Sequence, residues 1–255
     1  MGRYSCVLVD IDGVIKNRGT LIPGSITSLK TLLQQGFQVK LVTNCSLHKI
    51  YNLGNQLIPG YQLDILDPID VVKDLLKRDP WFQGKEIYVM GSKVIRTKIA
   101  TFDVSIREKG SWQGIDAVFL FEKRTYEESD IEGASKALIA GARFYCAGLD
   151  RHFWHEEKLH PGVGAITEQL IKKTGSNPIV LGKPSKDIFV LALHDVKDLK
   201  KVIFIGDDFH IDIIGAKAVG ISAALIGDDN HNSSSVTPDF VAADFESLLL
   251  RQLFD

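Results

Sequence analysis

Two aspartates one residue apart follow the first apolar run of the chain, in the string VLVDIDGV at residues 7–14. Alternate side chains of a strand point to the same face, so Asp10 and Asp12 are expected to converge just beyond the strand end. Two close carboxylates repel each other and attract a hard cation such as Mg²⁺. The other interpretation is a polar turn that only closes the strand, and this pair by itself leaves both interpretations open.

A hydroxyl and an amide follow a second apolar run, and a lysine stands in a turn much later in the chain. Thr43 and Asn44 can donate hydrogen bonds to phosphate oxygens beside a helix N-terminus, although such residues are also ordinary helix caps. Lys183 lies between a glycine and a proline, in a stiff turn that can aim its charge at an anion. A single lysine in a turn is most often solvated, so each of these signals is weak when taken alone.

A second acidic cluster ends the apolar run at residues 202–205. Asp207 and Asp208 follow this run, and Asp212 opens the next expected helix. The same string, Ile-Gly-Asp-Asp, recurs at residues 226–229 but leads into a polar loop with no following carboxylate. The string itself therefore carries little weight, and Asp212 together with the strand-to-helix context distinguishes the first copy from a turn.

Short apolar runs alternate with helical patterns along the chain, which is typical of a parallel sheet with helices on both faces. We expect strands at residues 4–9, 38–42, 86–90, 117–121, 143–146, 202–205 and 223–226. We expect helices at residues 25–35, 48–57, 92–100, 127–141, 163–173, from 186 onward, 213–219 and 245–253. The polar groups then lie at four strand-to-helix turns, at the edge where such sheets bind ligands.

Two polar segments rich in helix and strand breakers, residues 78–85 and 174–178, flank a block with its own alternation of strands and helices. Domain boundaries usually fall in such segments. The sequence therefore predicts a discontinuous core of residues 1–79 and 178–255 and an inserted domain of residues 80–177.

The composition narrows the class of protein. The chain has 255 residues, and its 30 basic and 32 acidic side chains leave a net charge of −2. This balance argues against nucleic acid or an anionic membrane surface as the main partner. No apolar run approaches the roughly 18 residues that a membrane span needs. Three widely spaced cysteines exclude a disulfide framework, so we expect a soluble, reduced protein of the cytoplasm.

Residues 151–160 are rich in histidine and acid but lack the spacing of a zinc protease. We expect His152, His155 and His160 on the surface or on a loop that faces the substrate, and not around a metal. Cys45, beside the second motif, is expected to be a buried thiol without a redox role.

Taken in order, the motifs resemble those of the haloacid dehalogenase (HAD) superfamily. The pair at Asp10 and Asp12, the pair Thr43 and Asn44, the turn at Lys183 and the acidic cluster from residue 207 have the character of its four motifs. The position and size of the insert look like the cap of the p-nitrophenylphosphatase-like (NagD-type) branch. The resemblance implies an α/β fold, in which a doubly wound, mostly parallel Rossmann-like core carries an inserted α/β cap domain.

The resemblance also implies an activity. The chain would be a Mg²⁺-dependent phosphoric monoester hydrolase that acts on a small phosphorylated metabolite through an aspartyl-phosphate. Asp10 would be the nucleophile and Asp12 the general acid and base. Mg²⁺ would be bound by the Asp10 carboxylate, the Asp12 backbone carbonyl and Asp207.

The remaining motif residues would bind the substrate or orient the site. Thr43, Asn44 and Lys183 would hold phosphoryl oxygens, and Asp208 and Asp212 would orient metal-bound water or Lys183. The cap would set the specificity, and in this branch two copies often pair through it. Two alternatives stay open: a phosphotransferase of the same fold, and a catalytically weak protein that binds a phosphorylated metabolite. The motifs do not select the substrate.

Overall fold

A computed structural model describes residues 3–108, 110, 112–155, 158–228 and 235–249, with the side chains of Ile50, Trp154 and His155 left out. The chain forms two compact units. The core unit comprises Met1–Thr43, Tyr51–Leu66 and Lys183–Asp255, and the insert unit comprises Asn44–Ile50 and Asp67–Gly182. Residues 80–177, the predicted inserted domain, lie within the insert unit, and the division into separately folding domains stays a prediction.

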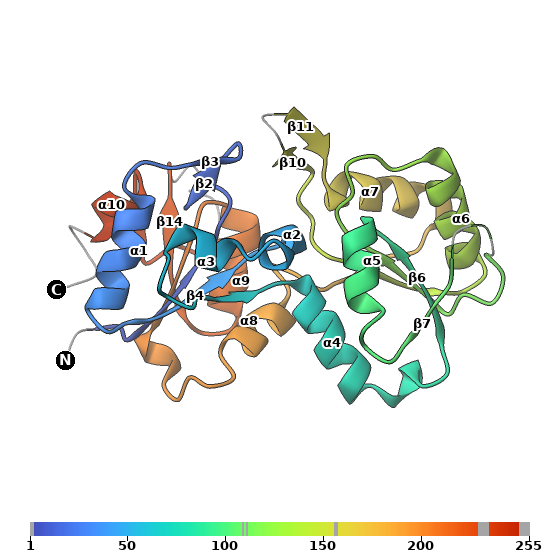
Figure 1. The fold of residues 1–255 in the computed structure, drawn as a ribbon, viewed down its shortest axis with the longest axis horizontal. Coiled ribbons are helices and arrows are strands. Elements are labelled where there is room, and N and C mark those ends of the chain that lie inside the picture. The colour runs from blue at the N-terminus through green and yellow to red at the C-terminus, as the bar shows by residue number, and fades with distance from the viewer. Residues whose placement is uncertain (1–2, 109, 111, 156–157, 229–234, 250–255) are drawn as a thin grey trace. The chain divides into compact units, whose positions relative to one another are not determined.

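A six-stranded sheet forms the centre of the core unit (Figure 1). Every neighbouring pair in it is parallel, which confirms the predicted α/β class. In spatial order the strands are β15 (Phe240–Ala242), β14 (Ser222–Ile226), β13 (Val202–Gly206), β1 (Cys6–Val9), β4 (Gln38–Val42) and β5 (Asp64–Leu66). β1 lies between β13 and β4, so the turn after β1 emerges at the middle of the carboxyl edge.

Helices cover both faces of this sheet because its strands bury both sets of alternating side chains. On one face, Val7 and Val9 pack with Leu29 of α1 (Ser25–Gln34) and with residues of α10 (Phe245–Leu248). On the other face, the Phe204 ring contacts Phe189 of α8 (Lys186–Ala192), with ring centroids 5.3 Å apart. A π-helical turn, η3 (Phe209–Ile213), leads from β13 into α9 (Ile214–Ala218). The remaining elements are the hairpin β2 (Lys16–Asn17) and β3 (Thr20–Leu21), helix α3 (Leu53–Leu57) and the 3₁₀ turn η2 (Leu199–Lys201).

The insert unit contains a second parallel sheet, of five strands. Its order is β12 (Ile179–Val180), β9 (Arg143–Cys146), β8 (Ala117–Leu120), β6 (Glu86–Met90) and β7 (Ser105–Ile106). Phe119 and Tyr145 stack on one face at 4.6 Å, and on the other face the Tyr88 hydroxyl donates to Asp130. The helical elements are α2 (Ser46–Ile50), α4 (Pro68–Arg78), η1 (Pro80–Phe82), α5 (Lys93–Ile99), α6 (Glu128–Ile139) and α7 (Val163–Thr174).

The predicted helix over residues 48–57 is wrong. Two short helices, α2 and α3, occupy this stretch, and Asn52 between them has a φ of 56°, which no α-helix contains. The helix expected from residue 213 begins earlier, because η3 starts at Phe209. Helix α10 ends at Leu248, and residues 250–253 of its predicted range lie outside the described residues.

Helix α4 was not predicted, although its start signal is in the sequence. Asp67 and Asp70 form a capping box, and Pro68 occupies the first helical turn.

The histidine-rich segment is a hairpin of β10 (His152–His155) and β11 (Lys158–Pro161), in which the rings of Phe153 and His160 stack at 5.3 Å. The side chain of His155 lies outside the described residues.

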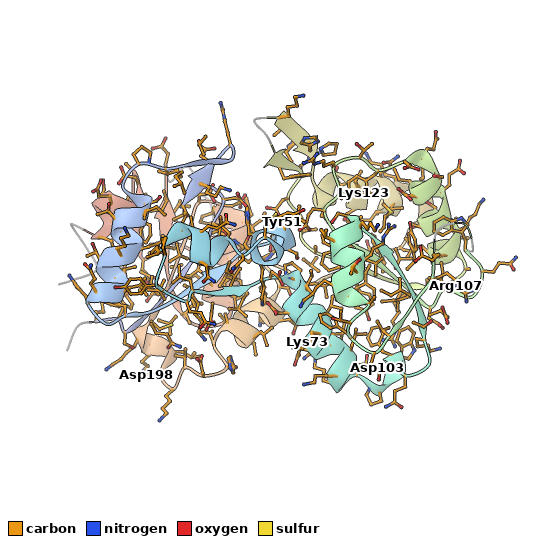
Figure 2. The ribbon with its side chains drawn as sticks, viewed as in Figure 1. Tyr51, Lys73, Asp103, Arg107, Lys123 and Asp198 are labelled. Carbon is orange, nitrogen blue, oxygen red and sulfur yellow. The ribbon has the colours of Figure 1, made fainter. Side chains whose placement is uncertain are left out.

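Charged side chains are present on the outside of both units. Lys73, Asp103 and Asp198 are exposed and project away from the ribbon (Figure 2). No helix among the described residues combines the length and the apolar character that crossing a bilayer requires.

Cys45 is half-buried and therefore more exposed to solvent than the buried thiol that the sequence predicted.

Candidate active site

Asp10 lies one residue beyond β1, at the middle of the core sheet's carboxyl edge. Its backbone N–H donates to the Ile205 carbonyl at 2.9 Å, so the parallel pairing with β13 continues into the turn. Its Oδ1 accepts from the Ile11 N–H at 2.7 Å, and 7% of the residue is exposed. The carboxylate is therefore held in place by backbone that the sheet itself positions.

Lys183 reaches this carboxylate from the turn before α8. Its Nζ lies 2.7 Å from Asp10 Oδ1 and 2.8 Å from Asp212 Oδ1, and 2% of the residue is exposed. Burial by itself lowers the pKa of a lysine, but the two carboxylates outweigh it, and the pKa of Lys183 is above its usual value. Lys183 is therefore a fixed cation against Asp10 at neutral pH.

Asp212 and Asp208 organise the turn between β13 and α9. Asp212 Oδ2 accepts from the backbone N–H groups of Asp207 at 3.1 Å and Asp208 at 3.2 Å. Asp208 Oδ1 accepts from the N–H groups of His210 at 2.7 Å and Ile211 at 2.9 Å, so it caps the helical turn. Asp212 thus orients Lys183, while the Asp208 carboxylate accepts hydrogen bonds from the backbone of its own turn.

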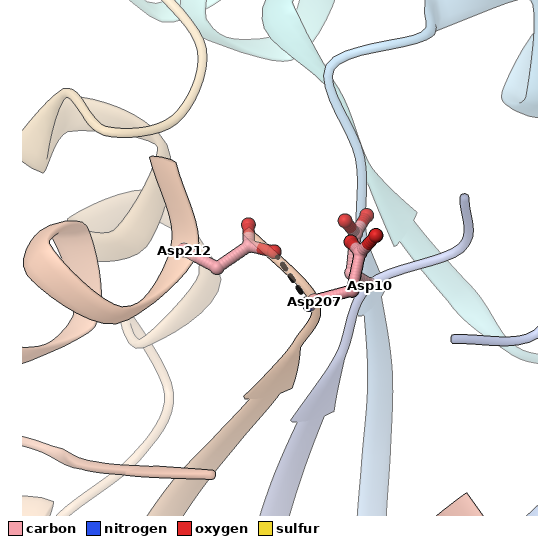
Figure 3. A group of neighbouring side chains, drawn as sticks. All are labelled: Asp10, Asp207 and Asp212. Carbon is pink, nitrogen blue, oxygen red and sulfur yellow. Dashed lines mark hydrogen bonds between the residues drawn. The ribbon is translucent and has the colours of Figure 1, made fainter. Parts of the chain in front are cut away.

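The carboxylates of Asp10 and Asp207 lie beside each other, with Asp212 across from them (Figure 3). Burial raises the pKa of Asp10 well above its usual value, Asp212 and Asp207 raise it further, and Lys183 opposes the shift. Asp207 is exposed to solvent. Partial loss of hydration is nevertheless the first cause that raises the pKa of Asp207 to about 7, and the charge of Asp212 is the second. Adding a proton and adding a cation are two ways of relieving the same repulsion.

These residues fit a divalent cation. Carboxylate oxygens of Asp10, Asp207 and Asp212 all lie within 4.8 Å of one another. One ammonium, that of Lys183, leaves two of the three negative charges uncompensated when all three are ionised. Oxygen donors with excess negative charge suit Mg²⁺. Asp212 Oδ1 already forms an ion pair with Lys183, and Asp212 Oδ2 accepts backbone hydrogen bonds. Asp10 and Asp207 are therefore the side chains that would hold the ion.

Gly13 makes room for this arrangement. Its φ is +88°, in the left-handed region, and a Cβ there would lie 1.9 Å from Asp207 Oδ2. The glycine that follows Asp12 is thus required both by its backbone conformation and by the close approach of Asp207. The sequence showed the glycine but not this second reason, because Asp207 is brought there by the fold.

Asp12 lies in the same turn as Asp10, and Thr43 follows β4 at the same edge of the core unit. Asp12 is exposed and its backbone pairs with Lys16, so its side chain is accessible to solvent beside the buried Asp10. Thr43 is 1% exposed, and its N–H donates to the Leu66 carbonyl at 3.0 Å.

Asn44 belongs to the insert unit, one residue after the core unit ends at Thr43. Its side-chain Nδ2 donates to Asp150 Oδ2 at 2.8 Å. The motif pair Thr43 and Asn44 is therefore divided between the two units, and no sequence pattern indicated this division.

The second Ile-Gly-Asp-Asp string lies closer to the site than the sequence indicated. β14 pairs with β13 in parallel, with Leu225 beside Gly206, so Asp207 and Asp228 follow neighbouring strands at the same edge. Asp207 and Asp228 both line one pocket of about 680 Å³ within the core unit, together with Gly13 and residues of the β2–β3 hairpin. The repetition of the string at the ends of two strands was the signal for this, but only the strand order makes it meaningful.

Two family models match the chain, and between them they contain every predicted site residue. The model described as haloacid dehalogenase-like hydrolase matches residues 7–105, and a second HAD-hydrolase-like model matches residues 180–248. The chain belongs to the haloacid dehalogenase-like hydrolases. This hydrolase is of the NagD type, as the motifs predicted, and its class is phosphoric monoester hydrolase.

Named relatives of this haloacid dehalogenase-like hydrolase are phosphatases. It is 25% identical over 226 residues to the ribonucleotide monophosphatase NagD of Escherichia coli K12, covering 86% of each protein. It is 28% identical over 229 residues to an acid sugar phosphatase of Staphylococcus epidermidis, covering 87% of this chain and 85% of the relative.

Solved structures share the fold of both units. The NagD structure from Escherichia coli aligns with a TM-score of 0.79 at 23% identity, over 95% of this chain and 97% of that one. A glycerol phosphate phosphatase from Mycobacterium tuberculosis, in complex with magnesium, aligns with a TM-score of 0.79 at 23% identity, over 96% of this chain and 76% of that one. A Rossmann-like core with an inserted cap is thus confirmed as the fold of this hydrolase.

Proposed function

We propose that the chain is a Mg²⁺-dependent phosphatase that hydrolyses a small phosphorylated metabolite through an aspartyl-phosphate on Asp10. The observation that supports this most strongly is the buried Lys183 ammonium, 2.7 Å from Asp10 and 2.8 Å from Asp212. A fixed cation beside the nucleophile offsets the repulsion between a carboxylate and an approaching phosphate dianion.

In the first step, an oxygen of Asp10 bonds to phosphorus while the bond from phosphorus to the ester oxygen breaks. Asp12 donates its proton to that departing oxygen, and an alcohol leaves. The exposure of Asp12 supports this role, because a group that exchanges protons with solvent is ready for the next turnover.

In the second step, Asp12 takes a proton from water as the water oxygen bonds to phosphorus. The bond from phosphorus to Asp10 breaks, inorganic phosphate leaves, and both aspartates return to their first state. Thr43, Asn44 and Lys183 would hold the phosphoryl oxygens throughout. Asp10, the Asp12 backbone carbonyl and Asp207 would hold Mg²⁺, which when bound supplies positive charge to those oxygens.

Phosphate release from p-nitrophenyl phosphate tests this proposal. The purified full chain is assayed with Mg²⁺, with chelator, and in isotope-labelled water. We expect release that needs Mg²⁺, with one labelled oxygen in the product phosphate. Release that survives chelation contradicts the metal role, and transfer to an added alcohol without labelled phosphate favours a phosphotransferase. Specificity carried by the insert unit, pairing of two copies through it, and a cytoplasmic location stay predictions.

A further inference from the structure

The Asn44 side chain is half-buried and contacts residues of its own unit, the insert unit. Its Nδ2 donates to Asp150 Oδ2 at 2.8 Å. A Cβ on Gly148 would lie 2.8 Å from Asn44 Nδ2, and a Cβ on Gly182 would lie 2.3 Å from Asn44 Oδ1. Two glycines from different turns thus form a slot that admits this amide because they have no side chains.

The chemistry of the partner fixes which way the amide points. An ionised carboxylate only accepts hydrogen bonds, so the nitrogen of Asn44 must face Asp150 and the oxygen must face Gly182. A hydrogen bond to a charged acceptor is also shorter and stronger than one between neutral groups. Asp150 therefore determines both the position and the orientation of this side chain.

The slot lies directly beside two groups of the proposed active site along the chain. Asn44 follows Thr43, and Gly182 precedes Lys183. The turn that carries Gly182 is itself anchored, because its N–H donates to the Ala147 carbonyl at 2.9 Å. Displacing the amide would therefore disturb the backbone next to both residues.

A second carboxylate of the insert unit holds the same segment at its other side. Glu122 Oε1 accepts from the backbone N–H of Leu47 at 3.1 Å, and 4% of Glu122 is exposed. Lys49 Nζ in turn donates to Asp70 Oδ1 at 2.6 Å. Asp150, Glu122 and Asp70 thus each hold the short segment from Asn44 to Lys49, and Asp150 holds the residue next to Thr43.

We propose that Asp150 is a positioning residue for phosphate binding, which it controls by holding the Asn44 amide in the slot between Gly148 and Gly182. Asp150 acts through Asn44 and touches no reacting atom. This inference rests on the proposed function, since it assumes that the Thr43–Asn44 turn binds phosphoryl oxygens.

A double-mutant cycle tests whether Asp150 acts through Asn44. Asn44→Ala, Asp150→Ala and the double variant are compared by kcat and KM for p-nitrophenyl phosphate and by the inhibition constant of inorganic phosphate. Asp150→Ala should raise KM and the phosphate inhibition constant about tenfold, with kcat changed less than about threefold. In the Asn44→Ala background the same change should have no further effect.

Two further variants separate positioning from folding. Asp150→Asn keeps a neutral acceptor and should restore part of the lost affinity. Gly148→Ala places a methyl group 2.8 Å from both Asn44 Nδ2 and Asp150 Oδ2 and should reproduce the KM increase even if Asp150→Ala does not fold. Glu168→Gln, which removes the exposed partner of the neighbouring Arg151, is the matched control and should leave KM unchanged.

The outcomes separate this inference from the proposed function. A folded wild type without phosphatase activity contradicts the proposed function. An active wild type in which Asp150→Ala or Gly148→Ala leaves both constants unchanged contradicts only the role of Asp150. Additive effects of Asn44→Ala and Asp150→Ala contradict it as well, because Asp150 would then act by another route.

Discussion

The two units contain parallel sheets of the same kind, yet their carboxyl edges differ in charge. In the core unit, Asp10 follows β1 and Asp207 follows β13, and Lys183 forms an ion pair with Asp10. In the insert unit, β6 and β9 are followed by small residues, and the buried carboxylate after β8 is Glu122. The topology provides a binding edge in both units, and among the described residues it is the core edge that brings three carboxylates within 4.8 Å of one another.

The buried carboxylates of the two edges are also satisfied differently. Asp10 is paired with a buried ammonium at 2.7 Å, whereas Glu122 Oε1 accepts from a backbone N–H at 3.1 Å. Burial raises the pKa of both groups, and that of Glu122 reaches about 7. The core edge therefore places an ion pair where a nucleophile is needed, while Glu122 stabilises the start of a helix.

The largest effect is expected from Asp10→Asn. The substitution is nearly isosteric but removes the attacking oxygen's charge, so kcat should fall by about 10⁴-fold or more, the scale seen for other covalent nucleophiles. Asp116→Asn is the matched control at the opposite end of the insert sheet, and it should leave kcat unchanged. Turnover of Asp10→Asn near the wild-type rate would place the nucleophile elsewhere.

The next largest effect is a loss of stability in Lys183→Met. This change leaves Asp10 and Asp212 buried without their counter-charge, so the free energy of unfolding should fall by about 3–5 kcal/mol. Lys40 is also 2% exposed, but it pairs with the solvent-accessible Asp195. Lys40→Met should therefore lower the free energy of unfolding by less than Lys183→Met does. Urea denaturation of both variants measures the difference, and equal losses would show that the two buried lysines have equivalent roles.

Glu122→Gln should change how stability depends on pH. The pKa of Glu122 is raised from 4.5 to about 7 in the folded chain, so the folded state binds more protons than the unfolded state between these values. Wild-type stability contributed by this group therefore falls as pH rises from about 4.5 to 7. Relative to wild type, the free energy of unfolding of the variant should increase by about 3 kcal/mol between pH 4 and pH 8. A constant difference across this range would mean that Glu122 does not titrate there.

The smallest expected effect compares the two Ile-Gly-Asp-Asp strings. Asp207→Asn should raise the Mg²⁺ concentration needed for half-maximal activity by about tenfold or more, because a neutral amide oxygen replaces a charged ligand. Asp228→Asn, at the end of the neighbouring strand, should leave that concentration unchanged. A titration of activity against Mg²⁺ measures both, and equal shifts would show that Asp228 also contributes to the metal site.

Much of the architecture could be predicted from local sequence. The observed bounds of β4, β6 and β9 match the predicted ones, because apolar runs bounded by turn residues have one favourable solution in a buried parallel sheet. The prediction of one helix over residues 48–57 was wrong because the apolar spacing there suits a helix. Asn52, whose left-handed backbone divides this stretch, carries no strong sequence signal for a helix end.

The chemistry available at each turn follows from the amino-acid sequence alone. Asp10, Thr43 and Asp207 could be selected because a polar group directly after an apolar strand must emerge at the sheet edge, and Lys183 because it lies between a glycine and a proline in a stiff turn. Their family also followed from this order of motifs.

Which of these groups come into contact depends on the three-dimensional fold. Lys183 bridges Asp10 and Asp212, Asp207 approaches Gly13, and Asn44 turns to Asp150, and each pairing joins turns that are distant in sequence. Strand order brings these turns together, and strand order depends on long-range packing that no local pattern encodes. Residue types therefore follow from the sequence, whereas counter-charges, shifted pKa values and the slot for Asn44 follow from the fold.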